Sequence, residues 1–162
     1  MAISILQDPV ESNHAKNTAR LANLILPQVR VFVGEKPSDF VQVRNRVQQY
    51  ERNLLIYPSD KAINIQQLCD KEPRCQHLIL LDGSWRKAKK LWLANEWLHE
   101  LDAGYLALAN STEYTIRKST TEHSLSTLEA LGHTLHLLED APLTPVFDVL
   151  NALQSHWHSH QK

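Results

Sequence analysis

The feature that most constrains the fold is an alternation of short apolar runs with longer amphipathic segments along the whole chain. Runs of this length typically form buried strands, and the amphipathic segments between them form helices that cover a sheet. We expect strands at residues 3–6, 29–33, 54–57, 78–81 and 105–109. We expect helices at residues 13–26, 40–50, 62–70, 84–93 or 84–98, 126–138 and 146–158. The alternation predicts an α/β fold, a mostly parallel sheet with helices on both faces.

A chain of 162 residues buries enough apolar surface to be stable without cross-links. No linker, repeat or low-complexity tract divides it, so we expect one domain over residues 1–162. Cys69 and Cys75 match no metal or redox spacing, and we interpret them as ordinary thiols in a reducing compartment. The first residues lack the basic start of a signal peptide, and no apolar segment approaches membrane-spanning length. These observations predict a soluble, cytoplasmic protein.

Basic residues are unevenly distributed, although the net charge of the chain is only −1. Residues 1–120 carry 16 Lys and Arg against 13 Asp and Glu, whereas residues 121–162 carry 1 against 5. The basic residues gather in groups at 44–52, 86–90 and 117–118. An isolated group of this kind is most often an ordinary solvated surface. The group at 86–90 directly follows a candidate site, which gives a nucleic-acid interface equal weight there.

That candidate site is the segment at residues 80–85, Leu-Leu-Asp-Gly-Ser-Trp, which ends an apolar strand in a carboxylate, a glycine, a hydroxyl and an indole. The carboxyl ends of parallel strands are where α/β proteins bind ligands, because side chains and free backbone amides converge there. A structural turn needs only Gly83 and a capping residue such as Ser84. Trp85 exceeds that requirement, so the segment indicates a binding or catalytic site.

Histidines gather near the end of the chain at positions 156, 158 and 160, and His156 and His160 share a helical face. No Cys or carboxylate completes a set of metal ligands with them. We interpret this group as part of a terminal helix that frays, and no metal is expected in the protein.

Five sequence blocks, in the same order along the chain, resemble those of a known protein family. They are Leu-Gln-Asp-Pro-Val-Glu at 6–11 with Asn-Thr-Ala-Arg at 17–20, Leu-Ile-Tyr-Pro at 55–58, Asp-Gly-Ser-Trp at 82–85, Tyr-Thr-Ile-Arg at 114–117 and Leu-Ser-Thr-Leu-Glu-Ala at 125–130. Together they resemble the DTW-domain family, which is named for an Asp-x-Thr-Trp signature. Each block alone is weakly specific, but their order across most of the chain makes the resemblance specific.

The resemblance implies a fold related to the SPOUT class, whose carboxyl-terminal region forms a trefoil knot around the cofactor. It implies transfer of the 3-amino-3-carboxypropyl group of S-adenosylmethionine to N3 of a uridine in tRNA, with release of methylthioadenosine. S-adenosylmethionine would be the cofactor and tRNA the partner. Two other functions stay open: a SPOUT-like methyltransferase that uses the same cofactor on RNA, and a non-catalytic module that binds RNA or the cofactor. The sequence gives neither the modified uridine nor the oligomeric state.

The chain departs from the family pattern in three ways. Ser84 stands where the family has Thr, which keeps the hydroxyl and its capping ability but loses a methyl group. Asp8 stands where members often carry His before Pro, so any role of that imidazole is absent or changed. Many members also have a cysteine cluster ahead of the first strand, and this sequence has none there.

The proton on uridine N3 must leave as the new bond forms, which makes Asp82 the candidate general base. The alternative is that Asp82 only accepts hydrogen bonds from backbone amides or ribose hydroxyls. Trp85 either stacks on a base or packs as a plug under the turn. Arg117 pairs either with a ligand or with Glu113 or Glu122 at the surface.

The remaining predicted site residues fall into two groups. The cofactor-binding group lies in the strand-end segments and at the start of the helix after residue 125: Leu55, Tyr57, Pro58, Ser59, Leu81, Gly83, Ser84, Trp85, Leu125, Ser126 and Thr127. The RNA-binding group consists of basic residues near those segments: Arg20, Arg86, Lys87, Lys90, Arg117 and Lys118.

Overall fold

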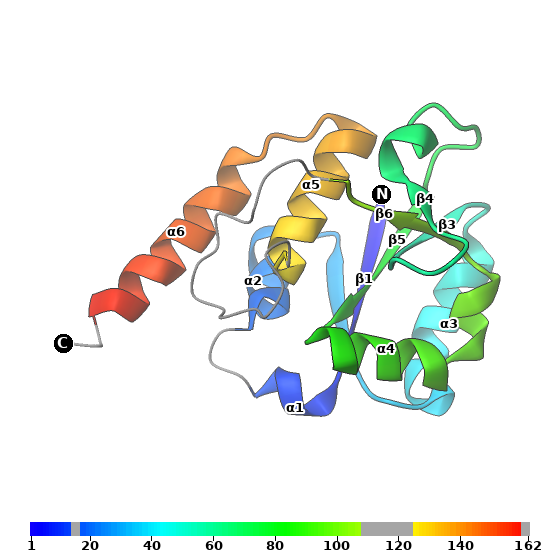
Figure 1. The fold of residues 1–162 in the computed structure, drawn as a ribbon, viewed down its shortest axis with the longest axis horizontal. Coiled ribbons are helices and arrows are strands. Elements are labelled where there is room, and N and C mark those ends of the chain that lie inside the picture. Colours follow the sequence, from blue (N-terminus) through cyan, green and yellow to red (C-terminus); the bar gives the residue numbers. More distant parts are fainter. Residues whose placement is uncertain (14–16, 108–124, 160–162) are drawn as a thin grey trace.

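The computed structural model describes residues 1–13, 17–107 and 125–159, the last three of them by their backbone only (Figure 1). The strands are β1 (Ala2–Gln7), β2 (Val29–Val33), β3 (Asn53–Ile56), β4 (Ile63–Asn64), β5 (His77–Asp82) and β6 (Asp102–Tyr105). The α-helices are α1 (Pro9–Ser12), α2 (Thr18–Ile25), α3 (Val41–Gln49), α4 (Trp85–Ala94), α5 (Thr127–Glu139) and α6 (Thr144–Ser159). Short 3₁₀ helices are η1 (Pro37–Phe40), η2 (Ile65–Leu68) and η3 (Glu96–Glu100).

The strands of the described residues form one six-stranded sheet in the order β2-β1-β5-β3-β6-β4. Every pairing in it is parallel. The prediction of an α/β fold with a mostly parallel sheet is therefore confirmed. Because all strands run in the same direction, their carboxyl ends lie along a single edge of the sheet, and β1 and β5 are neighbouring interior strands.

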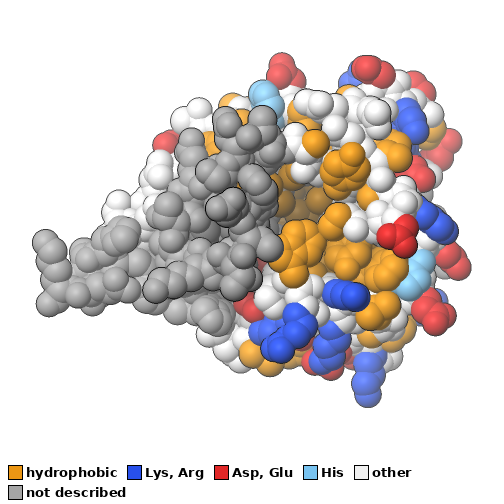
Figure 2. All heavy atoms as spheres, viewed as in Figure 1, with side chains coloured by type: hydrophobic (Ala, Val, Ile, Leu, Met, Phe, Trp, Pro, Cys, Tyr) orange, Lys and Arg blue, Asp and Glu red, His pale blue; other side chains and the backbone are white. Residues whose placement is uncertain are grey.

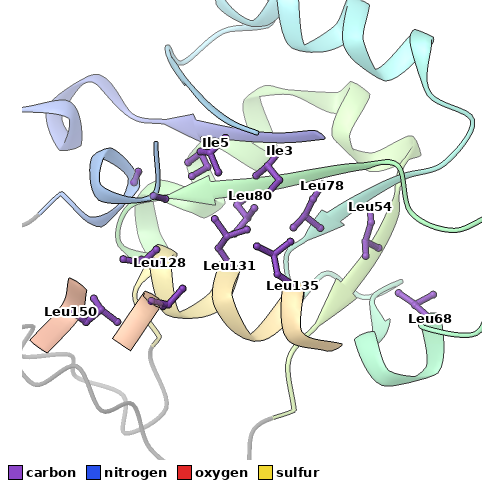
Figure 3. Packing of buried hydrophobic residues seen from close by; sticks show 14 residues of the cluster. Ile3, Ile5, Leu54, Leu68, Leu78, Leu80, Leu128, Leu131, Leu135 and Leu150 are labelled. Atoms are coloured by element: carbon purple, nitrogen blue, oxygen red, sulfur yellow. The ribbon is translucent and has the colours of Figure 1, made fainter. Parts of the chain in front are cut away.

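Helices cover both faces of the sheet, as predicted, because successive side chains of a strand point to opposite faces. On one face Ile3, Ile5, Leu78 and Leu80 pack against α2, α5 and α6 (Figure 3). On the other face Leu6, Leu55 and Ile79 pack with residues of α3, α4 and η3. Figure 1 shows α2, α5 and α6 on one side of the strands and α3 and α4 on the other. Sequence parity within each strand therefore decides which helices a side chain meets.

Two predictions about the elements around residues 60–110 were wrong. The expected helix at 62–70 is instead β4 followed by the single turn η2, because Ile63 pairs with β6 and the Asn64 side chain caps η2 by accepting from the Gln66 amide at 3.0 Å. The strand expected at 105–109 lies at Asp102–Tyr105, and residues 108 and 109 lie outside the described residues.

The offset of β6 has a steric reason at Gly104. A Cβ atom at Gly104 would lie 3.0 Å from Cγ1 of Ile65 and 3.3 Å from Cδ1 of Leu68. The strand therefore uses small residues where η2 packs onto it, so it lacks the apolar run by which a strand is recognised. A search for apolar runs along the sequence therefore places this strand at 105–109, three residues after its actual start at Asp102.

Helix α5 begins as the sequence predicts. Ser126 accepts from the Glu129 amide at 3.2 Å, and a Glu129 carboxylate oxygen accepts from the Ser126 amide at 2.8 Å, which forms a capping box. Its apolar stripe, formed by Leu128, Leu131 and Leu135, is buried against the sheet (Figure 3).

Several further predictions depend on residues 108–124, which lie outside the described residues. They are the resemblance block at 114–117 and the RNA contacts of Arg117 and Lys118; the trefoil knot likewise stays a prediction. No helix in the described part of the chain has the length and apolar character that a bilayer crossing requires. That the whole chain is one domain stays a prediction.

Candidate functional site

The candidate site lies where β1 and β5 end side by side at the carboxyl edge of the sheet. The strand register pairs Gln7 with Asp82. Alternate residues of a strand face the same side, so Gln7 points to the same face as Ile3 and Ile5. Asp82 likewise points to the same face as Leu78 and Leu80. Both side chains therefore point to the face covered by α5, whose first residue is Thr127.

The Asp82 carboxylate is held by two side chains from different elements. Its Oδ2 accepts a hydrogen bond from Gln7 Nε2 at 2.7 Å, and its Oδ1 accepts one from the Thr127 hydroxyl. Asp82 is only 1% exposed. We call Gln7, Asp82 and Thr127 the carboxyl-edge cluster. Hydrogen bonds to a charged acceptor are stronger than neutral ones, so the cluster ties β1, β5 and α5 together at this point.

Gln7 extends the cluster to the start of α2. The same Nε2 atom donates to Oδ1 of Asn17 at 3.0 Å, and this oxygen also caps α2 by accepting from the Arg20 amide at 3.0 Å. Asn17 Nδ2 donates to the carbonyls of Glu11 and Ser12, each at 3.3 Å. The side chains that follow β1 therefore share one hydrogen-bond network with Asp82.

Gly83 has a positive φ of 129°, which L side chains rarely adopt. A Cβ atom there would lie 3.1 Å from Cβ of Lys87 and 3.4 Å from Cγ of Glu11. Lys87 Nζ in turn donates to Glu11 Oε1 at 2.9 Å, and Glu11 is buried. The turn therefore packs tightly against this ion pair, and only glycine fits its backbone without strain.

The residues after Gly83 open α4. Ser84 caps it by accepting from the Lys87 amide at a long 3.4 Å. Trp85, the first helical residue, is 53% exposed. This exposure excludes the interpretation of Trp85 as a buried plug under the turn and leaves its indole accessible to a ligand.

Half-buried rings line the neighbouring strand end. The Tyr57 ring stacks on Trp92 of α4 with a centroid distance of 5.4 Å, and Trp92 lies 4.0 Å from the His99 ring. Burial raises the pKa of Tyr57, so its phenol stays protonated at neutral pH. Pro58 is exposed and Ser59 is half-buried.

Other predicted cofactor residues are less accessible. The Leu55 side chain is fully buried in the core between the sheet and α3, so only its backbone remains for a ligand. Leu81 is half-buried against the same core, and Leu125 and Ser126 precede Thr127 at the start of α5. Three predicted cofactor-binding segments therefore lie at the carboxyl edge of the sheet: the turn between β5 and α4, the residues after β3 that begin at Tyr57, and the start of α5.

The basic residues of α4 differ in their partners. Lys87 pairs with Glu11, and Lys90 Nζ pairs with Glu35 Oε1 at 2.9 Å. Arg86 and Lys89 are exposed and have no ion pair with any described residue. Figure 2 shows Lys and Arg side chains over α4 beside a group of hydrophobic side chains.

The other basic residues predicted to bind RNA are Arg20, Arg117 and Lys118, and the structure describes only the first of them. Arg20, at the start of α2, is exposed. Arg117 and Lys118 lie outside the described residues, as do Glu113 and Glu122.

Asp8 has a structural role in this chain. Its carboxylate accepts from the Val10 amide at 2.9 Å and so caps α1, where the family often has an imidazole. Gln7, Glu11 and Asn17 belong to the site but were not predicted as site residues. The parity of β1, combined with its pairing to β5, is the signal that would have placed Gln7 beside Asp82.

The cysteines and histidines provide no metal set among the residues that the structure describes. Cys69 and Cys75 are half-buried, and their thiols donate to backbone carbonyls. Burial raises the pKa of both thiols, that of Cys75 to about 11. His156 is exposed, whereas the side chains at 158 and 160 lie outside the described residues.

Comparison with known proteins shows which family and which proteins this chain is similar to. The family described as DTW domain matches residues 1–161. The tRNA-uridine aminocarboxypropyltransferase 2 of Drosophila melanogaster is 32% identical over 145 residues, which cover 86% of this chain and 57% of the fly protein. The proteins of the same name from Macaca fascicularis and Mus musculus are each 30% identical over 139 residues, covering 83% of this chain and 47% of their own. The chain spans about half the length of these curated relatives, and no solved structure matches it. The chain belongs to the DTW-domain family.

Proposed function

We propose that this chain transfers the 3-amino-3-carboxypropyl group of S-adenosylmethionine to N3 of a uridine in tRNA and releases methylthioadenosine. The names of the three relatives support the reaction. The observation that carries the proposal is the buried Asp82 carboxylate, held by Gln7 and Thr127 at the carboxyl edge of a parallel sheet. Ligands of α/β proteins bind at this edge, and here it ends in the family signature.

The reaction is a displacement at a saturated carbon. A bond forms between uridine N3 and Cγ of the methionine moiety while the bond from Cγ to sulfur breaks. The electron pair of the broken bond moves to sulfur, which leaves as the neutral thioether of methylthioadenosine. The N3 proton passes to a base. When bound, S-adenosylmethionine supplies the activated carbon and a good leaving group, so the protein chiefly has to orient the two reactants.

Asp82 is the proposed acceptor of the N3 proton. Each carboxylate oxygen has two lone pairs, and Gln7 and Thr127 occupy one on each oxygen. The remaining lone pairs are free to accept a proton from a substrate that approaches the end of β5. Because both hydrogen bonds come from fixed elements, the carboxylate does not have to be reoriented as the reaction proceeds.

The start of α5 has the donors that a cofactor carboxylate requires. The Ser126 amide already donates to Glu129, whereas the amides of Thr127 and Leu128 make no hydrogen bond with any described residue. Free amides at the start of a helix favour an anion because the helix dipole points its positive end there. The half-buried rings of Tyr57 and Trp92 offer an apolar surface for an adenine. These residues fit S-adenosylmethionine, and we propose that they hold it.

Helix α4 is the proposed contact with tRNA. Trp85, Arg86 and Lys89 are exposed on its first two turns, next to the turn that ends in Asp82. An accessible indole stacks on unpaired bases, and cations without carboxylate partners attract phosphates. Arg20, Arg117 and Lys118 stay predictions for the same interface, and we extend the proposal to the cytoplasm, where tRNA is abundant.

The test is incubation of the protein with S-adenosylmethionine and an unmodified tRNA transcript, followed by nucleoside mass analysis and analysis of the small-molecule products. We expect a uridine enlarged by one aminocarboxypropyl group and an equal amount of methylthioadenosine. A methylated nucleoside with S-adenosylhomocysteine would instead identify a methyltransferase. Binding of both ligands without any modified nucleoside would identify a non-catalytic module.

A further inference from the structure

We infer that Gln7 is the positioning residue of the proposed reaction: its amide holds the Asp82 carboxylate in the orientation that meets uridine N3. The inference rests on the proposed function, because it assigns Gln7 a role in that reaction only. Gln7 is 2% exposed and lies at the end of the interior strand β1, so its side chain acts on the site through Asp82.

Both hydrogens of the Gln7 amide group are used. One goes to Asp82 Oδ2 at 2.7 Å and the other to Asn17 Oδ1 at 3.0 Å. A glutamine has two such donors on one nitrogen, so it bridges two oxygen acceptors that otherwise repel each other. A carboxylate or an apolar group at this position cannot satisfy both acceptors. The residue type at position 7 is therefore set by the two oxygens it faces.

The bridge starts from a rigid part of the molecule. β1 lies between β2 and β5, and its pairing with β5 extends from Ala2 to Gln7. The nitrogen of Gln7 is thus fixed by the sheet, and Asn17, its second acceptor, is fixed as the cap of α2. A donor with two fixed points sets the direction of the carboxylate more strictly than a donor on a mobile loop.

Loss of the Gln7 donor leaves Thr127 as the one side-chain donor to Asp82 among the described residues. The carboxylate is then free to turn about its last torsion, which is soft for a terminal sp² group. Misplacement of a reacting group by about 1 Å costs about 100-fold in rate. The effect falls on the chemical step, because Gln7 itself has almost no exposed surface with which to bind a ligand.

The test compares Gln7→Met, which keeps the length of the side chain and removes both donors, with wild type. We expect kcat for aminocarboxypropyl transfer to fall by about 10- to 100-fold. We expect KM for tRNA, and the affinity and stoichiometry of S-adenosylmethionine binding by calorimetry, to stay within about threefold of wild type. The binding stoichiometry counts folded sites, so a loss of kcat at unchanged stoichiometry is not a loss of folded protein.

Ser4→Ala is the matched control. Ser4 lies on the same strand, is also buried and hydrogen-bonds to His77 of β5, but it points to the other face of the sheet, three residues before Gln7. We expect this variant to lower stability and leave kcat within about twofold of wild type. A similar fall of kcat in both variants would overturn the inference, because it would reflect any weakening of β1.

Gln7→Glu provides a second variant if Gln7→Met does not fold. It keeps the shape of the side chain and replaces the donor nitrogen by oxygen, so we expect at least the same fall of kcat. A kcat within twofold of wild type in either folded variant would overturn the inference. If wild type itself makes no aminocarboxypropyl uridine, the proposed function fails instead, and the two failures are distinguished by the wild-type assay.

Discussion

β5 begins at His77 in one polar cluster and ends at Asp82 in another, and the two clusters differ in kind. At the carboxyl edge, the charged Asp82 is held by Gln7 and Thr127. At the opposite edge, Ser4, His77 and Asn53 form an amino-edge cluster in which both ring nitrogens of His77 have a partner at 2.8 Å. His77 and Asp82 are both at most 1% exposed, and both are hydrogen-bonded to side chains of other elements. Burial and hydrogen bonding do not by themselves mark a functional site.

The difference lies in charge and in what surrounds each cluster. Burial, with a smaller contribution from Arg46, lowers the pKa of His77 to about 4, so the amino-edge cluster is neutral at pH 7. Both nitrogens are occupied, which leaves the ring no free position for a ligand. The carboxyl-edge cluster instead keeps unused lone pairs on Asp82 and lies at the turn that leads into the exposed Trp85. The comparison predicts that one cluster supports chemistry and the other supports stability.

The largest expected effect is that of Asp82→Asn. We expect it to lower kcat for transfer by about 10²- to 10⁴-fold, because an amide does not accept the N3 proton. The affinity for S-adenosylmethionine should change by less than about threefold, since Asn keeps the size of the side chain. The measurement combines single-turnover transfer with calorimetric binding. Asp102→Asn, an exposed carboxylate at the start of β6, is the control, and unchanged turnover in Asp82→Asn would refute the base role.

The second prediction concerns stability at the amino edge. The pKa of His77 is lower in the folded state than its ordinary value of 6.5, so the unfolded chain takes up a proton that the folded protein does not. This contribution to stability is complete above pH 6.5 and is lost as the pH falls toward 4. We expect it to lower the free energy of unfolding by about 3 kcal/mol at pH 4, as measured by urea denaturation across this range.

His77→Gln separates this effect from the other titrating groups. The amide keeps two polar contacts and does not titrate, so its denaturation curve should depend less on pH between 6.5 and 4 than that of wild type. Its transfer rate at neutral pH should stay within about twofold of wild type. Equal pH dependence in both proteins would contradict the assignment to His77, and a large loss of transfer would erase the contrast between the two edges.

The sequence predicts elements well where local chemistry and core packing agree. At the start of α5, the capping box of Ser126 and Glu129 and the spacing of Leu128, Leu131 and Leu135 indicate the same helix, and the structure confirms it. β4 and β6 fail for the opposite reason, because a two-residue strand and a strand built from Ala103 and Gly104 have no apolar run. Their position is set by packing with η2, which is a tertiary effect.

The candidate site shows the same limit. Asp82 and Trp85 are recognisable because they follow a strand in an unusual combination, whereas Gln7 is one polar residue at the end of another strand. Its importance depends on the register between β1 and β5, which lie 75 positions apart at this contact. The pairing of Lys87 with Glu11, 76 positions away, likewise removes a cation from the group that composition alone assigns to RNA.

A third prediction separates the cations of α4 by their partners. Arg86→Ala and Lys89→Ala should each weaken tRNA binding by about 3- to 10-fold at 0.1 M salt and reduce the slope of log Kd against log salt by about 0.7 to 0.9. Lys90→Ala should have a smaller effect, because the hydrogen bond to Glu35 raises the pKa of Lys90 and its charge is largely matched. Filter binding over a salt series measures both quantities. Equal effects at all three positions would show that pairing with Glu35 does not matter.

The smallest expected effect tests whether every residue of the signature is functional. Ser84 caps α4 through a long and exposed hydrogen bond, so Ser84→Ala should lower the free energy of unfolding by about 0.5 to 1 kcal/mol and leave kcat within about twofold of wild type. Ser126→Ala should lower the free energy of unfolding by more, about 1 to 2 kcal/mol, because that cap is buried and Glu129 accepts a reciprocal hydrogen bond from the Ser126 amide. Urea denaturation measures the stability of both variants, and the transfer assay measures their kcat. If each residue of the signature has its own role, Asp82 serves the chemistry, Gly83 the turn, Ser84 the cap and Trp85 the ligand. A large loss of kcat in Ser84→Ala would contradict this division, because it would assign the Ser84 hydroxyl to the reaction.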